Sequence, residues 1–177
     1  MKYFQITYAE NSDYEPYGVA CASSDVDPFL LPKSGTKIES WKPLTLELRR
    51  GEFADYLTND LGARLCSLHM KRILEKNRSI NDELQWLEVL VSKTNGESKK
   101  YYALHFPEDY PVVNKEKSTM AGDMVVKSVL DINTVKDHNI FTLPGEAGRT
   151  IYISEHLKEA IESNELTGMA FVKVSTA

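Results

Sequence analysis

The sequence contains only two cysteines, Cys21 and Cys66. Two are too few for the disulfide framework that holds many small secreted proteins together. The first segment, residues 1–8, also lacks the apolar core of a secretion signal, because Gln5 and Thr7 interrupt it. We therefore expect reduced thiols and a cytoplasmic location.

Long apolar runs are also missing, since none approaches the roughly 18 residues of a membrane-spanning helix. We therefore expect no membrane partner. Acidic residues outnumber basic ones by 26 to 21, which gives a net charge of −5. A general nucleic-acid binder would need a basic surface to neutralise phosphates, so nucleic acid is not an expected partner. The one basic stretch, residues 64–78, is interpreted as the solvated face of a helix.

The familiar catalytic spacings are absent from the chain. It has no Gly-x-x-x-x-Gly-Lys-Ser/Thr phosphate loop, no Gly-x-Gly-x-x-Gly, no Gly-x-Ser-x-Gly and no His-Glu-x-x-His. Phosphate cradling, hydride cofactors, the nucleophile elbow and zinc-protease chemistry therefore have no support in the sequence. We predict no catalytic residue and no cofactor.

Cys66 and His69 supply one half of a zinc-like spacing. A structural zinc site needs four ligands, and the sequence offers no second Cys/His pair, so we predict no metal site. Cys66 or Ser67 could also suggest a nucleophile with His69 as its base. Residues two apart on a helix point in different directions and cannot pair directly, and Ser67 is better explained as the N-cap of a helix.

What the sequence does contain indicates an α+β fold. At 177 residues, 42% of them hydrophobic, the chain is predicted to form a single domain over residues 1–177. Its alternating runs mostly neighbour one another in sequence, which favours a mostly antiparallel sheet with a few packed helices. Residues 10–43 hold four of the seven prolines and are expected to form an irregular arm, with a short strand near 18–22.

The individual elements can be placed from periodicity and turn residues. The sequence Asn95-Gly96 lies between two β-rich runs and predicts a hairpin with a loop longer than two residues. Ser67 and Ser154 each precede an amphipathic segment and predict helices over 67–77 and 154–164. The predicted strands cover residues 2–8, 44–48, 53–57, 84–92, 99–106, 123–131, 139–143, 150–153 and 168–174.

The order of these elements resembles the immunity proteins of bacterial polymorphic-toxin systems, specifically an immunity family long catalogued as a domain of unknown function. The resemblance covers residues 53–174. It rests on Asp55-Tyr-Leu, Leu65-Cys66-Ser67 and its helix, Tyr101-Tyr-Ala-Leu, Ser118 before Val125–Leu130, Ile140-Phe-Thr-Leu, Ile151-Tyr-Ile-Ser-Glu-His-Leu and Gly168-Met-Ala-Phe-Val-Lys-Val. The chain departs from the family pattern at Leu65-Cys66, where a β-branched pair is more typical, and this leaves the register of that step open.

The resemblance implies a non-enzymatic protein that binds and neutralises a cognate toxin domain. It transfers no binding residue. Aromatic side chains with acidic neighbours on loops would suit a basic toxin. We therefore predict partner contacts at Tyr14, Glu15, Tyr17, Glu108, Asp109 and Tyr110. A small regulatory or ligand-binding module, or a small enzyme using Cys66 or the histidines, remains the alternative, and the oligomeric state is left open.

Overall fold

The computed structural model describes residues 1–9, 17–24, 27, 31–122, 124–146 and 150–177. Three short helices lie among these residues: α1 (Leu68–Asn77), α2 (Ile132–Val135) and α3 (Glu155–Ser163). The strands are β1 (Tyr3–Tyr8), β2 (Val19–Ala22), β3 (Leu44–Leu48), β4 (Tyr56–Asn59), β5 (Leu65–Cys66), β6 (Gln85–Lys93), β7 (Ser98–His105), β8 (Thr119–Ala121), β9 (Met124–Lys127), β10 (Val129–Leu130), β11 (Ile140–Phe141), β12 (Ile151–Ser154) and β13 (Met169–Thr176). No helix in this part of the chain is long and apolar enough to cross a membrane.

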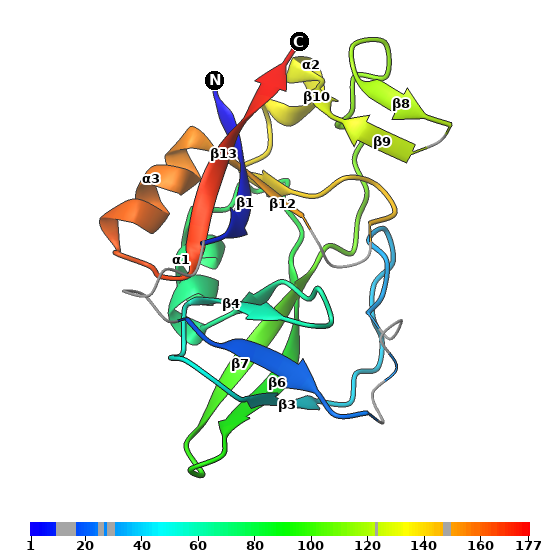
Figure 1. The fold of residues 1–177 in the computed structure, drawn as a ribbon. Helices are drawn as coiled ribbons and strands as arrows, with labels where there is room; N and C mark the ends of the chain where they lie inside the picture. Colours follow the sequence, from blue (N-terminus) through cyan, green and yellow to red (C-terminus); the bar gives the residue numbers. More distant parts are fainter. Residues whose placement is uncertain (10–16, 25–26, 28–30, 123, 147–149) are drawn as a thin grey trace.

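The strands form an open sheet, a closed barrel and a separate hairpin (Figure 1). The open sheet has the order β10-β13-β1-β12-β11, and the barrel has the order β2-β3-β6-β7-β5-β4. The hairpin pairs β8 with β9. Eight of the eleven pairings between described strands are antiparallel, and the parallel ones are β2–β4, β3–β6 and β10–β13. The expectation of a mostly antiparallel α+β fold is thus compatible with the structure, whereas the closure of six strands into a barrel was not predicted.

The central strand of the open sheet, β1, contributes buried side chains on both faces. Because side chains alternate along a strand, Ile6 of β1 points to the helical side, where it joins a buried cluster with Leu74 of α1 and Leu157 of α3. Tyr3 points the other way and packs with Phe141 and other buried residues of a second cluster. Both faces of β1 therefore contribute to a core, which fixes the register of the central strand.

The barrel encloses a third cluster, contributed mainly by inward-facing aliphatic side chains of its strands. Its longest pair is the hairpin β6–β7, whose ladder ends at Ser92 opposite Ser98. The turn contains Gly96 with φ at +89° and a bond from the Lys93 N–H to the Glu97 carbonyl of 2.7 Å. The hairpin predicted from Asn95-Gly96, including its longer loop, is confirmed.

Both predicted helices are also confirmed, together with their caps. The Ser67 hydroxyl accepts the Met70 N–H at 3.0 Å, and the Ser154 hydroxyl accepts the Leu157 N–H at 3.3 Å. Each cap satisfies one of the backbone donors that a helix start leaves without an intrahelical acceptor. The four-residue helix α2 was not predicted, because so short a segment carries no periodic signal.

Two predicted strands differ in detail. The run 53–57 was expected to be extended, but the strand β4 occupies Tyr56–Asn59 instead. The single strand expected over residues 123–131 is divided at Ser128 into β9 and β10. The Ser118 hydroxyl accepts the Val129 N–H at 2.9 Å, so a side chain takes the place of a strand partner at the break. Such competition from a serine side chain is a known cause of local departures from a ladder.

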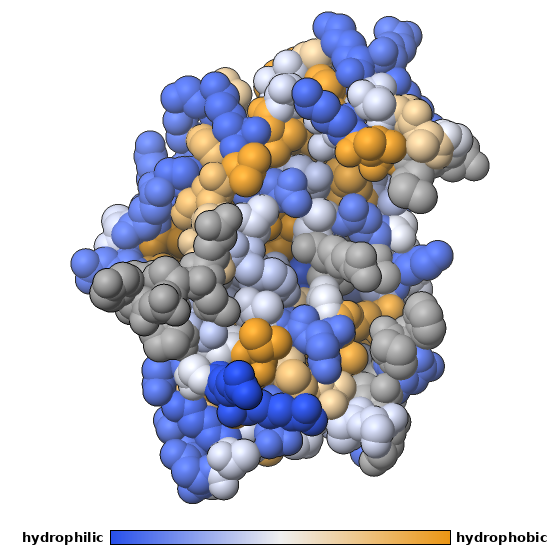
Figure 2. All heavy atoms as spheres, viewed as in Figure 1, coloured by the Kyte–Doolittle hydropathy of each residue, from blue (hydrophilic) through white to orange (hydrophobic). Residues whose placement is uncertain are grey.

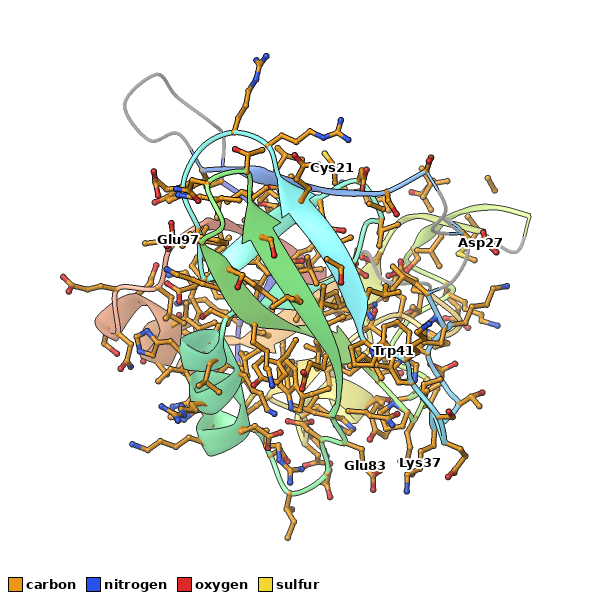
Figure 3. All side chains as sticks on the ribbon, turned by 90° about the horizontal axis from the view of Figure 1, so that it is seen from below. Cys21, Asp27, Lys37, Trp41, Glu83 and Glu97 are labelled. Atoms are coloured by element: carbon orange, nitrogen blue, oxygen red, sulfur yellow. The ribbon has the colours of Figure 1, made fainter. Side chains whose placement is uncertain are left out.

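The second part of the arm, residues 31–43, lies along the barrel. The Trp41 indole donates to the Glu88 carbonyl at 2.9 Å, and the Gln85 amide makes two bonds with the backbone of Ile38. Figure 3 places Trp41 near the start of β3, beside the barrel strands. This half of the arm is therefore an ordered cover, and the short strand predicted near residues 18–22 exists as β2.

Candidate partner-binding site

The predicted contact residues do not form one cluster. Tyr14 and Glu15 lie outside the described residues. Tyr17 is partly buried against the barrel cluster, and its backbone forms a parallel bridge with Glu52. Tyr110 packs instead against the cluster on the open sheet. The structure thus assigns the two predicted aromatic positions that it describes to different cores.

Tyr110 is held in place by its surroundings. Its ring packs on the His138 ring with centroids 4.1 Å apart, and its hydroxyl donates to the Asn81 carbonyl at 2.8 Å. Burial raises its pKa to about 12. His138 is itself bonded through Nδ1 to Asp82 Oδ1 at 2.9 Å, and Asp82 is fully buried. Tyr110, which was predicted to contact a partner, therefore belongs to a network of structural contacts with Asn81 and His138.

Glu108 and Asp109 are exposed, unlike Tyr110. Asp109 Oδ2 accepts the Gly145 N–H at 3.0 Å, which ties this acidic loop to the turn that follows β11. Both carboxylates are thus accessible from solvent, on a loop that is held by the bond between Asp109 and Gly145. Their role in binding stays a prediction.

The residues around the start of α1 are not arranged as a Ser-His-carboxylate triad. Cys66 is fully buried, and burial raises the pKa of its thiol well above the ordinary range. The Ser67 hydroxyl donates to Asp55 Oδ1 at 2.5 Å, and His69 Nδ1 lies 3.9 Å from the same oxygen. In a serine hydrolase the histidine lies between the serine and the carboxylate, so that it can take the hydroxyl proton. Here the carboxylate lies between them, so the serine does not bond to the histidine as it does in that triad.

No group of three or more His, Cys, Asp or Glu side chains that could hold a metal ion occurs in the described part of the chain. Within the described residues, Cys66 and His69 are therefore not joined by further side chains that would complete a metal site. Every buried side-chain nitrogen and oxygen of the described residues has a hydrogen-bond partner.

Arg64 corrects the interpretation of the basic stretch 64–78 as one solvated face. Its side chain turns inward and is only 1% exposed. Its guanidinium donates to the Thr150 carbonyl and the Thr142 hydroxyl, each at 2.7 Å, and lies over the Phe106 ring. Burial lowers its pKa to about 10, so the group remains charged at neutral pH. Arg64 precedes the helix, and its partners come from segments about 80 residues away, which helical periodicity could not reveal.

The described residues form an open groove beside the sheet, here called the β13 groove. Its floor is the face of the sheet opposite α3, and its walls are β9 and the turn after β11. The groove has a volume of about 380 Å³ and is lined by Gln5, Val125–Ser128, Leu143, Glu146, Thr150, Tyr152 and Val172–Ser175. Val126 on one side and Val172 on the other are 63% and 53% exposed. Hydrophobic atoms reach the surface over both strands (Figure 2).

A second hollow, of about 560 Å³, lies between the start of α1 and β7. It combines aromatic rings with lysines. The ammonium of Lys99 lies 4.6 Å from the centre of the Phe53 ring, and that of Lys71 lies 4.3 Å from the Tyr102 ring. Each contact places a cation over an aromatic face, an arrangement that stabilises the exposed charge. The lining of this second hollow includes Lys99 and Lys100 together with the carboxylate of Asp55.

The β13 groove was not found from the sequence, because it joins β1, β9, β12 and β13. The only local signal was the alternation of β13, in which Val172 falls on the same face as Val174. A single exposed valine is ordinary on a protein surface. Only the neighbouring Val126, brought close by the fold, makes it a candidate interface.

Comparison with known proteins gives one family. The model of the immunity protein family Imm11 matches residues 27–176. No curated protein matches the chain. The matched range includes both barrel and open sheet, except β1 and β2.

Proposed function

We propose, from the premise that the chain belongs to the immunity protein family Imm11, that it neutralises a cognate toxin of a bacterial polymorphic-toxin system by direct binding. The family match over residues 27–176 is the observation that carries this proposal, and it confirms the resemblance inferred from residues 53–174. The protein would act in the cytoplasm, as a stoichiometric inhibitor and without chemistry of its own.

The geometry supports binding better than catalysis. The thiol of Cys66 is buried, and the Ser67 hydroxyl is engaged by Asp55 and by the helix start. By contrast, the exposed apolar pair Val126 and Val172 borders an open groove. These two side chains provide apolar area that a bound protein would bury.

The acidic balance of the chain would assist one class of partner. A net charge of −5 attracts a basic toxin domain such as a nuclease, and long-range attraction raises the association rate. The exposed carboxylates of Glu108 and Asp109 would contribute to this field. The contacts that hold the complex would come from preformed, rigid surface.

Co-expression tests the proposal. The toxin domain encoded beside this gene is expressed in a bacterial host with and without the protein, and the two purified proteins are mixed and separated by size. We expect growth to be restored and a one-to-one complex to form. Equal killing in both strains, together with no complex on mixing, would refute the proposal for that pair.

A titration separates stoichiometric binding from enzymatic inactivation. Toxin activity is measured at increasing ratios of the protein, and we expect it to fall linearly and reach zero near one equivalent. Complete loss of activity at a small fraction of one equivalent would show turnover and would contradict the non-enzymatic part of the proposal.

A further inference from the structure

Strand β13 has an open edge. It pairs with β1 in the register Tyr8↔Met169 to Tyr3↔Val174, and the Ala9 N–H donates to the Gly168 carbonyl. In an antiparallel pair the bonded positions alternate. The even-numbered residues of β13 therefore bond to β1, and Met169, Phe171 and Lys173 direct their N–H and C=O groups away from it.

Only the far end of this edge is paired. β10 runs parallel to β13 at Ser175 and Thr176, and the Ala177 N–H donates to the Leu130 carbonyl. None of the described residues bonds to the backbone of Met169, Phe171 or Lys173 on the outer side. Three donors and three acceptors in a row on this strand thus have no backbone partner among the described residues.

The edge is open because β9, the strand before β10, does not run along β13. Had the chain stayed extended through Ser128, β9 would have continued the parallel ladder of β10 along β13. Instead the N–H and carbonyl of Val129 bond to the Ser118 hydroxyl and the Asn114 N–H, both at 2.9 Å, and β9 pairs with β8. The β13 groove lies between β13 and the diverging strand β9. In Figure 1, β13 lies in front of β1, and β8 and β9 stand off to one side.

A hollow lies beside this edge on each face of the sheet. The β13 groove lies on the face of Val172 and Val174. Another hollow, of about 440 Å³ and distinct from the one beside α1, is lined by Met1, Lys2 and Lys173–Thr176. Lys173 is exposed and has no carboxylate within ion-pair distance among the described residues, while Lys2 is paired with Glu155 at 2.7 Å. An extended chain laid on the edge would direct alternate side chains to these two faces.

We propose that the edge of β13 from Met169 to Lys173 binds an extended segment of the toxin as an added strand. The inference rests on the function proposed above and specifies its interface. Main-chain hydrogen bonds would provide affinity, and alternate side chains would provide specificity, as in other cases of strand addition. On the valine face the segment carries apolar side chains, and beside Lys173 it carries an acidic one.

Two substitutions of one residue separate backbone from side chain. Lys173→Ala removes the charge and keeps the outward N–H, whereas Lys173→Pro also removes that donor. Proline is tolerated at an edge position whose N–H faces solvent. Affinity for a catalytically inactive form of the neighbouring toxin domain is measured by calorimetry, and thermal melts establish that both variants are folded. We expect Lys173→Pro to weaken binding by about tenfold more than Lys173→Ala, as expected for one lost hydrogen bond.

A third variant tests the choice of surface, and amide exchange tests the edge directly. Lys99→Glu alters the basic hollow beside α1, and we expect its affinity to stay within about twofold of the unsubstituted protein. In the complex we expect the Phe171 and Lys173 amides to become protected from hydrogen exchange. This readout is independent of any substitution.

The outcomes are distinct. If the complex forms but these amides exchange as in the free protein, the edge inference is overturned and the proposed function stands. If no complex forms with the toxin, the proposed function fails for that pair and the inference fails with it. If the protein alone self-associates with the edge amides protected, the occupant is a second copy of the chain, and the proposal is overturned.

Discussion

Asp55 and Ser67 share a hydrogen bond of 2.5 Å, from the serine hydroxyl to Oδ1 of the carboxylate. The other carboxylate oxygen accepts both the N–H and the hydroxyl of Thr167, each at 3.0 Å. One side chain therefore joins the start of α1 to the segment that leads into β13. Because β13 belongs to the open sheet and α1 follows the barrel strand β5, Asp55 connects this sheet to the barrel.

Removing that carboxylate should destabilise the whole protein. We expect Asp55→Ala to lower the free energy of unfolding by about 2–4 kcal/mol, because three donors lose a charged acceptor. Urea denaturation followed by circular dichroism measures the change. Asp137→Ala, at an exposed position, is the matched control and should change stability by less than about 0.5 kcal/mol. Equal effects of the two substitutions would contradict this role of Asp55.

Gly168 is predicted to be irreplaceable for a different reason. Its φ is +90°, and a Cβ there would lie 2.3 Å from the Tyr56 carbonyl oxygen and 2.6 Å from the Ala54 Cβ. Gly96 has nearly the same φ of +89° but open space around it. We expect Gly96→Ala to cost about 1–2 kcal/mol from backbone strain alone. Gly168→Ala should cost clearly more, and similar melting temperatures for the two variants would refute the steric argument.

The two thiols should react at very different rates. Cys66 is fully buried and its pKa is raised by burial, whereas Cys21 is partly exposed. Since the thiolate is the reactive form, we expect a thiol reagent to modify one cysteine rapidly in the native protein and the second only on unfolding. Cys21→Ser is the control and should abolish the rapid phase. A rapid phase that persists in this variant would identify Cys66 as an accessible thiol and revive the enzymatic alternative.

His105 should make stability depend on pH. Its Nε2 lies 2.6 Å from the Thr36 carbonyl oxygen, and burial lowers its pKa below the ordinary value of 6.5. Below about pH 6.5 the unfolded chain therefore binds a proton that the folded protein resists, so stability falls as pH decreases through this range. We expect His105→Gln to lessen the loss of unfolding free energy between about pH 7 and pH 5. The exposed His156→Gln is the control and should leave the slope unchanged, and identical slopes in all three proteins would contradict the prediction.

The acidic loop can be tested through association kinetics. If Glu108 and Asp109 help to attract a basic toxin, replacing both by lysine should slow association by about tenfold at low salt. The difference should shrink at higher ionic strength because salt screens exposed charges. Glu159→Lys on α3 with Glu165→Lys in the turn that follows this helix changes the net charge equally and serves as the control. Equal slowing in both double variants would show that net charge matters and the position of the loop does not.

Local signals in the sequence were sufficient for the elements that local physics determines. Ser67 and Ser154 marked the helix starts, and Asn95-Gly96 marked the hairpin, because caps and turns depend on a few neighbouring residues. Barrel closure could not be read in this way. It depends on the parallel pairing of β3 with β6, whose residues are more than 40 positions apart.

The candidate site was harder still to predict. The sequence suggests that Tyr110 is an exposed aromatic residue on a loop. In the structure its ring packs on His138, which comes from a distant segment. The break at Ser128 depends on Ser118, on the other side of the hairpin. The β13 groove follows from that break, so no single stretch of sequence contains it. Family resemblance succeeded here because it draws on the order of elements rather than on any one contact.

The pairing of Tyr3 with Val174 also has a consequence in time. A ribosome adds about 5–20 residues per second, so β1 is made on the order of ten seconds before β13. Until β13 is available, one side of β1 has no partner, and pairing across so long a stretch of chain is slow. The pairing of β1 with β13, and the edge that β13 presents, can therefore form only after β13 has been synthesised. If the protein neutralises a toxin as proposed, protection would depend on molecules that are already folded when the toxin arrives.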